Sequence, residues 1–181
     1  MPAKHDRKAK IKIISWNIEH KKTTRGLYTC KLDDPDFCAN FVDADIICLQ
    51  ETHGNIKIKD FVCYNSLRSP NPTLSAGLCI AVKRDIARGI KRIPNTHSKS
   101  TDVLTVKLDH SFFRLKEPIF VVTTYISPKN SSYSIKNPTI NTYEDLADEI
   151  AELKNGGHVI VCGDFNARST RRRQWCFRFT Q

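Results

Sequence analysis

Short apolar runs recur along the chain at intervals typical of buried β-strands. Each is four to seven residues long and rich in Val, Ile and Leu, and they occupy residues 11–16, 45–50, 77–82, 119–125 and 159–162. Such runs are expected for strands that are buried on both faces or lie in a sandwich core. In residues 103–108, Leu104, Val106 and Leu108 form one apolar face, which predicts a half-exposed strand.

Two segments between these predicted strands show helical patterns. Residues 142–157 predict an amphipathic helix, with Thr142 and Asp145 as its capping box and two glycines as its stop signal. A second helix is predicted to begin at Asp34 and Pro35. No repeat, low-complexity segment or linker divides the chain. The pattern therefore predicts one α/β domain with the layers of an α/β sandwich.

The composition fits one globular domain and gives no sign of export. The 181 residues are 40% hydrophobic, yet no apolar run approaches the roughly 18 residues needed to span a bilayer. The charged N-terminus leads into an apolar run that is too short for a signal-peptide core. None of the seven cysteines forms a C-x-x-C pair. We expect a nuclear or cytoplasmic protein with reduced cysteines that is neither secreted nor bound to membranes.

The net charge of +10 lies at the two ends of the sequence. Residues 1–25 contain eight basic and two acidic side chains, residues 168–181 contain five arginines and no acid, and the remainder sums to −1. Basic arms can bind nucleic acid by neutralising phosphates, but blocks of like charge are more often solvated tails. Both interpretations stay open. We divide the chain into a basic tail (1–10), a domain (11–168) and a basic, atypical tail (169–181).

Polar side chains stand at or just after the ends of the apolar runs. They are Asn17, Glu51, Tyr125, Asp164 and Asn166. Because Asp and Asn are common turn formers, a turn alone accounts for several of them. Side chains at the ends of adjacent strands also converge on one crevice, the usual place for a site in layered α/β folds. Alternation along an extended chain would place Asp164 and Asn166 on the same side.

These residue types suit metal-assisted cleavage of a phosphate ester. The carboxylate of Glu51 and the amide oxygen of Asn17 are hard ligands for Mg²⁺ or Mn²⁺. Asp164 can activate or position a water molecule, while Asn166 and Tyr125 can donate hydrogen bonds to phosphate oxygens. The set therefore predicts phosphodiester hydrolysis.

Five segments in this order resemble the endonuclease/exonuclease/phosphatase family. They read SWNIE, DIICLQETH, GLCIAVK, VVTTYISP and VIVCGDFNAR, and the resemblance covers about residues 11–168. It implies two β-sheets packed together and flanked by helices, with the site at one edge and Mg²⁺-dependent chemistry. It also implies a metal held by Asn17 and Glu51, and catalytic roles for Tyr125, Asp164 and Asn166.

Details of these segments favour the endonuclease branch of non-LTR retrotransposons. The segments CLQETH, TTYISPKNSSYS and GDFNAR resemble that branch, whereas the inositol polyphosphate phosphatase branch has tryptophan where Val161 stands. DNA is therefore the expected partner, and no stable protein partner is expected.

The family also has a further aspartate and a Ser-Asp-His segment beyond this last strand, and the thirteen residues after Arg168 contain neither. We expect a sandwich truncated at its C-terminus, self-association through uncovered sheet surface, and weak catalysis. Two other functions stay open. One is an inactive remnant that binds nucleic acid, and the other is a phosphatase that acts on a small phosphate ester.

The charge distribution leads to a test of the basic ends. Deletion of residues 1–9 and 169–181 removes most of the positive charge, so affinity for duplex DNA should fall and its salt dependence should flatten. Fluorescence anisotropy of a labelled duplex at several salt concentrations measures both quantities. Unchanged affinity and slope would place the DNA-binding surface in the body of the domain instead.

Overall fold

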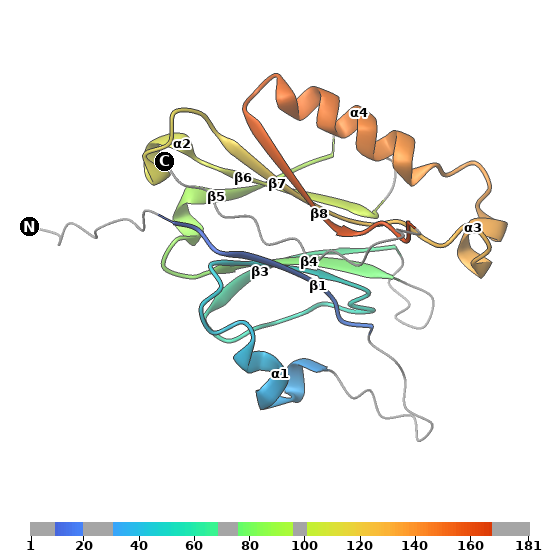
Figure 1. Ribbon diagram of the computed structural model, residues 1–181, viewed down its shortest axis with the longest axis horizontal. Coiled ribbons are helices and arrows are strands. Elements are labelled where there is room, and N and C mark those ends of the chain that lie inside the picture. The colour runs from blue at the N-terminus through green and yellow to red at the C-terminus, as the bar shows by residue number, and fades with distance from the viewer. Residues whose placement is uncertain (1–9, 20–30, 69–75, 96–100, 168–181) are drawn as a thin grey trace, which may run out of the picture.

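Two four-stranded β-sheets pack face to face in the computed structural model, which describes residues 10–19, 31–68, 76–95 and 101–167 (Figure 1). The first sheet has the order β1 (Ile13–Asn17), β2 (Ile46–Gln50), β4 (Gly77–Lys83) and β3 (Phe61–Leu67). The second has the order β5 (Ile90–Ile93), β6 (Val103–Leu108), β7 (Ile119–Tyr125) and β8 (His158–Asp164). The predicted α/β sandwich of two sheets is confirmed.

Each sheet is antiparallel except for one parallel pair at its edge. The parallel pairs are β1 with β2 and β7 with β8. Their registers align the carboxyl ends of the partners, because Asn17 lies opposite Gln50 and Tyr125 lies opposite Asp164. The edge strands β1 and β8 also contact each other across the sandwich. The sandwich therefore brings the ends of both parallel pairs to one edge.

Apolar side chains fill the space between the sheets and cover their outer faces. The inner layer is contributed by both sheets, and its most buried members include Ile46, Cys48, Ile80, Val106 and Val121. The outer face of the second sheet is covered by α4 (Thr142–Lys154), which packs Leu146 and Leu153 against Phe120 and Val122 (Figure 1). The outer face of the first sheet is covered by a cluster that includes Ile18, Phe41 and Ile56.

Among the described residues, three shorter helices and two turns of 3-10 helix connect these elements. The helices are α1 (Pro35–Ala39), α2 (His110–Phe113) and α3 (Ser132–Lys136), and the turns span Lys31–Asp33 and Ala87–Gly89. Helix α1 confirms the predicted start, since Asp34 is its N-cap and accepts a hydrogen bond from the Asp36 backbone N–H. The proline at the first position fits this helix start because its missing N–H would have no helical partner.

The structure corrects two details of the predicted elements. Strand β6 is not half-exposed, because Val103 and Thr105 on its second face are also buried, and Val103 packs in the same cluster as Leu146 of α4. The cap of α4 is Asn141, whose side chain accepts hydrogen bonds from the backbone N–H groups of residues 143 and 144. The predicted capping box one residue later is therefore wrong. Strands β3 and β5 were not predicted.

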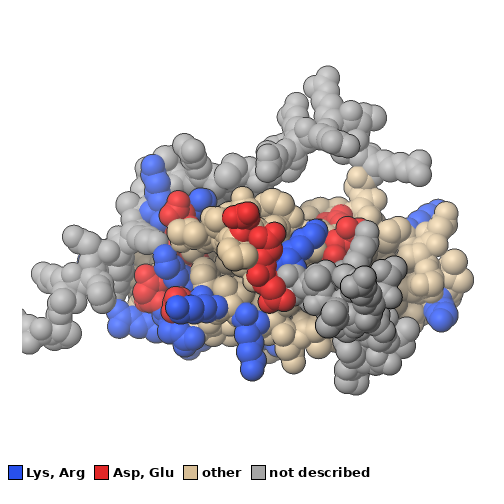
Figure 2. Space-filling model, turned by 90° about the horizontal axis from the view of Figure 1, so that it is seen from below, with Lys and Arg blue, Asp and Glu red and all other residues tan. Residues whose placement is uncertain are grey.

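Three further observations within the described ranges concern membrane spans, cysteines and surface charge. No helix there is long and apolar enough to cross a membrane. The five cysteines in those ranges, Cys38, Cys48, Cys63, Cys79 and Cys162, are free thiols. Basic and acidic side chains lie beside each other on the face shown in Figure 2, so neither sign covers that face alone. Most of the two predicted basic ends lies outside the described residues.

The backbone conformation directly before Asp164 requires glycine at position 163. Its φ is 145°, and a Cβ at this position would collide with the carbonyl oxygen of Thr124 in β7. Gly163→Ala should therefore lower the free energy of unfolding by about 1–3 kcal/mol or more. Gly54→Ala is the matched control, since a Cβ there meets no atom within 4 Å. Equal denaturation midpoints for the two variants would contradict this account.

Candidate active site

Four of the five predicted site residues meet where the ends of the parallel pairs converge. Asn17 ends β1, Glu51 directly follows β2, Tyr125 ends β7 and Asp164 ends β8. Each sheet thus contributes two polar side chains from rigid strand ends. Strand ends hold a constellation more accurately than loops do.

The Asn17 carboxamide joins the two sheets at this point. Its Nδ2 donates one hydrogen bond to Glu51 Oε1 over 2.9 Å and another to Asp164 Oδ2 over 2.8 Å. Its Oδ1 accepts a hydrogen bond from the Glu19 backbone N–H at 2.9 Å. Because an amide NH₂ has two donors, Asn17 uses both of them to hold two carboxylates that would otherwise repel each other.

Glu51 is held in its charged form by polar neighbours. His53 is the strongest of them, with its Nε2 3.8 Å from Glu51 Oε2, and Asn17 donates a hydrogen bond to Glu51 Oε1. These contacts lower the pKa of Glu51 to about 2, although partial burial opposes the shift. Both Glu51 and His53 have a positive φ, so the backbone turns sharply after β2. The carboxylate is therefore ionised at neutral pH.

The Tyr125 phenol stays protonated beside this carboxylate. Burial raises its pKa well above the ordinary value, and the nearby charge of Glu51 raises it further. A phenol that keeps its proton is a hydrogen-bond donor, which is the state needed to contact an anionic oxygen.

Asn166 does not follow the predicted alternation. Strand β8 ends at Asp164, and Asn166 has a left-handed φ of 44°. Its Nδ2 donates to the Ile126 backbone carbonyl at 2.7 Å, and its backbone N–H donates to Asp164 Oδ1 at 2.9 Å. The carboxylate of Asp164 is thus oriented by Asn17 on one oxygen and by Asn166 on the other.

Gln50, the buried last residue of β2, holds the strands beside the site together. It was not identified from the sequence. It is buried, and its Nε2 donates to Ser15 Oγ in β1 at 3.2 Å and to Thr123 Oγ1 in β7 at 2.9 Å. It therefore ties β2 to its parallel neighbour and to the opposite sheet. Its one signal in the sequence is its position, because Gln50 is a polar residue at the end of the apolar run 45–50 and directly before Glu51.

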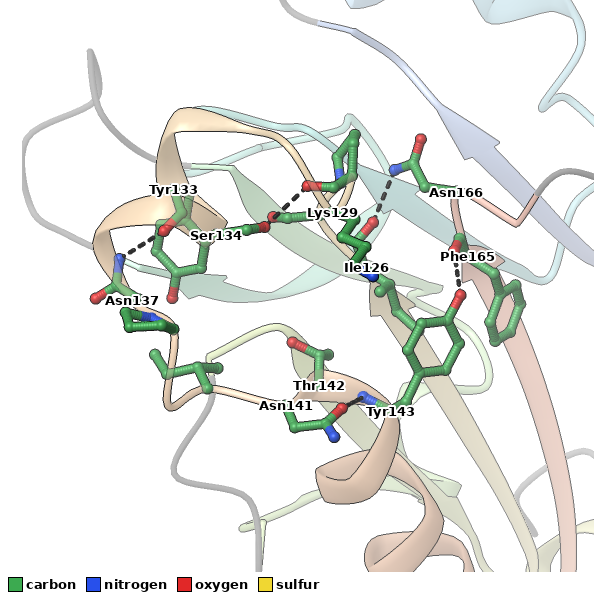
Figure 3. A pocket seen from close by; sticks show the side chains of 14 residues that line it. Ile126, Lys129, Tyr133, Ser134, Asn137, Asn141, Thr142, Tyr143, Phe165 and Asn166 are labelled. Carbon is green, nitrogen blue, oxygen red and sulfur yellow. Dashed lines mark hydrogen bonds between the residues drawn. The ribbon is translucent and has the colours of Figure 1, made fainter.

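A cavity of about 380 Å³ opens beside Asn166, between the end of β7, α3 and the start of α4 (Figure 3). Tyr133 and Tyr143 form parts of its wall, and the Tyr143 hydroxyl donates to the Phe165 backbone carbonyl at 2.8 Å. We call Asn17, Glu51, Tyr125 and Asp164 the polar cluster. The cavity adjoins it, because Asn166 lines the cavity and hydrogen-bonds to Asp164.

The cluster fits a hard divalent cation. Among the described residues no group of three or more His, Cys, Asp and Glu side chains is arranged to enclose a metal. Mg²⁺ usually takes only one or two protein carboxylates and keeps several waters, so such a cage is not needed. Glu51 supplies an ionised carboxylate. Asp164 supplies a second carboxylate group, and the Asn17 side chain contacts both of them.

Comparison with known proteins gives a family and a fold. A family model described as the Endonuclease/Exonuclease/phosphatase family matches residues 14–179. No curated protein matches the chain. The catalytic domain of human Nocturnin, solved with a bound sulfate anion, is similar in structure with a TM-score of 0.59 and 15% identity. That match covers 89% of this chain and 65% of the Nocturnin chain.

Two structures of Caenorhabditis elegans TDP2 have the same fold. A truncated form has a TM-score of 0.53 at 15% identity, covering 88% of this chain and 63% of its own. A selenomethionine form has a TM-score of 0.52 at 17% identity, covering 88% and 48%. The chain thus spans less than two thirds of the length of each of these structures.

The low pKa of Glu51 predicts a pH-dependent contribution to stability. A carboxyl whose pKa falls from 4.5 to about 2 on folding stabilises the fold above pH 4.5, and this stabilisation is lost as the pH falls through that range. In EDTA, the difference in melting temperature between the wild type and Glu51→Gln should therefore shrink between about pH 5 and pH 3. A difference that stays constant with pH would show that Glu51 is not held ionised by the fold.

Proposed function

The chain belongs to the Endonuclease/Exonuclease/phosphatase family, and we propose that it is a Mg²⁺-dependent phosphodiesterase domain of the non-LTR retrotransposon type that cleaves DNA. One observation carries the proposal. The Asn17 carboxamide holds the carboxylates of Glu51 and Asp164 together at the edge where the two sheets meet. This arrangement supplies hard oxygen ligands and a base on opposite sheets, with a protonated phenol beside them.

Each residue has a role in the proposed reaction. Glu51 would hold Mg²⁺, and Asn17 would join it through Oδ1 once its carboxamide turns, because Nδ2 faces Glu51 in this structure. The ion would supply Lewis-acid stabilisation of charge on the phosphate. Asp164 accepts a proton from the water that attacks phosphorus, while the bond from phosphorus to the leaving sugar oxygen breaks. Tyr125 donates a hydrogen bond to a non-bridging phosphate oxygen, and Asn166 orients Asp164 through its backbone N–H.

The choice of DNA rests on three supporting observations. The segments around Glu51, Tyr125 and Asp164 resemble the retrotransposon branch, and Val161 stands where the inositol polyphosphate phosphatase branch has tryptophan. Most of the net positive charge lies in the terminal segments, as expected for contacts with phosphates. The related fold of human Nocturnin was solved with a bound sulfate, an anion similar in shape to phosphate.

A second candidate is a domain that binds nucleic acid without cleaving it. It is favoured by the net positive charge, most of which lies in residues 1–25 and 168–181 and can neutralise phosphates without any catalytic group.

The proposal predicts metal binding and metal-dependent nicking. Mg²⁺ or Mn²⁺ should raise the melting temperature of the wild type, and Glu51→Gln should abolish that rise. In Mg²⁺ the wild type should nick supercoiled plasmid at a slow but measurable rate, and Asp164→Asn should reduce that rate by about 10² or more. Asp85→Asn is the matched control because Asp85 is exposed and lies outside the site.

The same assays separate the alternatives. Salt-dependent binding to DNA with equal, background nicking by the wild type and Asp164→Asn would support the inactive domain. Hydrolysis of p-nitrophenyl phosphate while plasmid stays intact would support a phosphatase. An identical metal response in the wild type and Glu51→Gln would remove Glu51 from the metal site.

A further inference from the structure

A buried arginine, Arg68, lies beside Tyr125 of the polar cluster and takes no part in the function proposed above. Arg68 follows β3, and its side chain is only 7% exposed. Its Nε and Nη2 donate to the two carboxylate oxygens of Asp102, over 2.5 and 2.6 Å. Asp102 is 2% exposed, so the ion pair is removed from water.

The guanidinium of Arg68 also contacts two tyrosines and a serine. Its Cζ lies 3.6 Å from the ring centre of Tyr133 in α3 and 5.4 Å from that of Tyr125 in β7. Its Nη2 donates a further hydrogen bond to Ser127 Oγ at 2.7 Å. Arg68 thus touches the end of β7, the loop after it and the helix that walls the cavity beside Asn166.

Asp102 holds the same stretch of β7 through its backbone. Its carbonyl oxygen accepts hydrogen bonds from the Tyr125 backbone N–H at 3.1 Å and from Thr124 Oγ1 at 2.8 Å. The main chain of Tyr125 is therefore fixed by Asp102, and its ring lies beside the guanidinium that the Asp102 carboxylate holds. Both halves of the ion pair act on one residue of the cluster.

Burial removes both charges of this ion pair from water, and apolar side chains of similar volume often stabilise a buried site equally well. A guanidinium, unlike an ammonium or an apolar group, is a planar fork that pairs with a carboxylate at two atoms and stacks on aromatic rings. These are the contacts that Arg68 makes.

We propose that Arg68 is a positioning residue that holds the Tyr125 ring in the orientation from which its hydroxyl reaches the reacting phosphate. The part that concerns the phosphate rests on the proposed function. The orientation of the ring does not, so the two are tested separately.

The orientation is tested by ¹⁹F NMR of the chain labelled with 3-fluorotyrosine. Tyr→Phe variants assign the resonances of all five tyrosines, Tyr28, Tyr64, Tyr125, Tyr133 and Tyr143. Arg68→Lys keeps the charge but loses the fork and the stacking, so the Tyr125 and Tyr133 resonances of the folded protein should move while those of Tyr64 and Tyr143 stay. A role limited to stability would increase the unfolded fraction and leave the folded resonances in place, which would overturn the proposal.

The effect on catalysis is tested by a double-mutant cycle in the nicking assay. Arg68→Lys should lower kcat by about 10- to 100-fold with little change in KM, because a displaced Tyr125 weakens a contact made in the transition state. In a Tyr125→Phe background the same substitution should change kcat by less than about twofold. An equal loss in both backgrounds would contradict the proposal. Arg92→Lys is the control, since Arg92 is an exposed arginine bonded to the Asn65 carbonyl.

Arg68→Lys could fail to fold, and the wild type could cleave no substrate; each case leaves a decisive measurement. If Arg68→Lys does not fold, Ser127→Ala removes one hydrogen bond of the guanidinium and should shift the Tyr125 resonance and lower kcat about 2- to 10-fold. No shift in Ser127→Ala would then reject the proposal. If the wild type cleaves no substrate, the proposed function fails, while the NMR result still decides whether Arg68 orients Tyr125.

Discussion

The candidate site depends on one carboxamide placed between two carboxylates. Asn17 lies on the first sheet with Glu51, whereas Asp164 lies on the second, and the two amide hydrogens of Asn17 are divided between them. Without this donor, two anions would face each other where the sheets meet, and each would be incompletely solvated. The buried Gln50 repeats the connection one residue deeper, between β1, β2 and β7. The sheets are thus joined by polar contacts at the site and by apolar packing elsewhere.

Most of the fold could be predicted from the sequence because hydrophobic periodicity reports burial directly. The apolar runs became β1, β2, β4, β7 and β8, and their polar ends converged as parallel neighbours do. Strand β6 was misjudged because alternation describes one face of a strand, whereas the other face is covered by α4, which begins 34 residues after the strand ends. Strands β3 and β5 are less buried and mix polar with apolar residues, so their signal was weak.

The site was predicted in its residue types but not in its geometry. Asn166 was expected to face the same way as Asp164, and the chain instead turns through a left-handed residue that directs the Asn166 side chain to the Ile126 carbonyl. The pairing of Arg68 with Asp102 had no local signal, because these residues are 34 positions apart and meet only after β3 and β6 have packed. Contacts of this kind follow from tertiary packing, which no short motif records.

The division of the sheets along the chain has a consequence for the order of folding. All strands of the first sheet precede residue 84 and all strands of the second follow residue 89, so each sheet can form from contacts within its own half. The bond from Asn17 to Asp164 closes 147 residues, which makes it among the entropically most demanding contacts of the chain. During synthesis the first half leaves the ribosome before the second exists. The Asn17–Asp164 contact that joins the two sheets at the site therefore cannot form until the end of β8 has been synthesised.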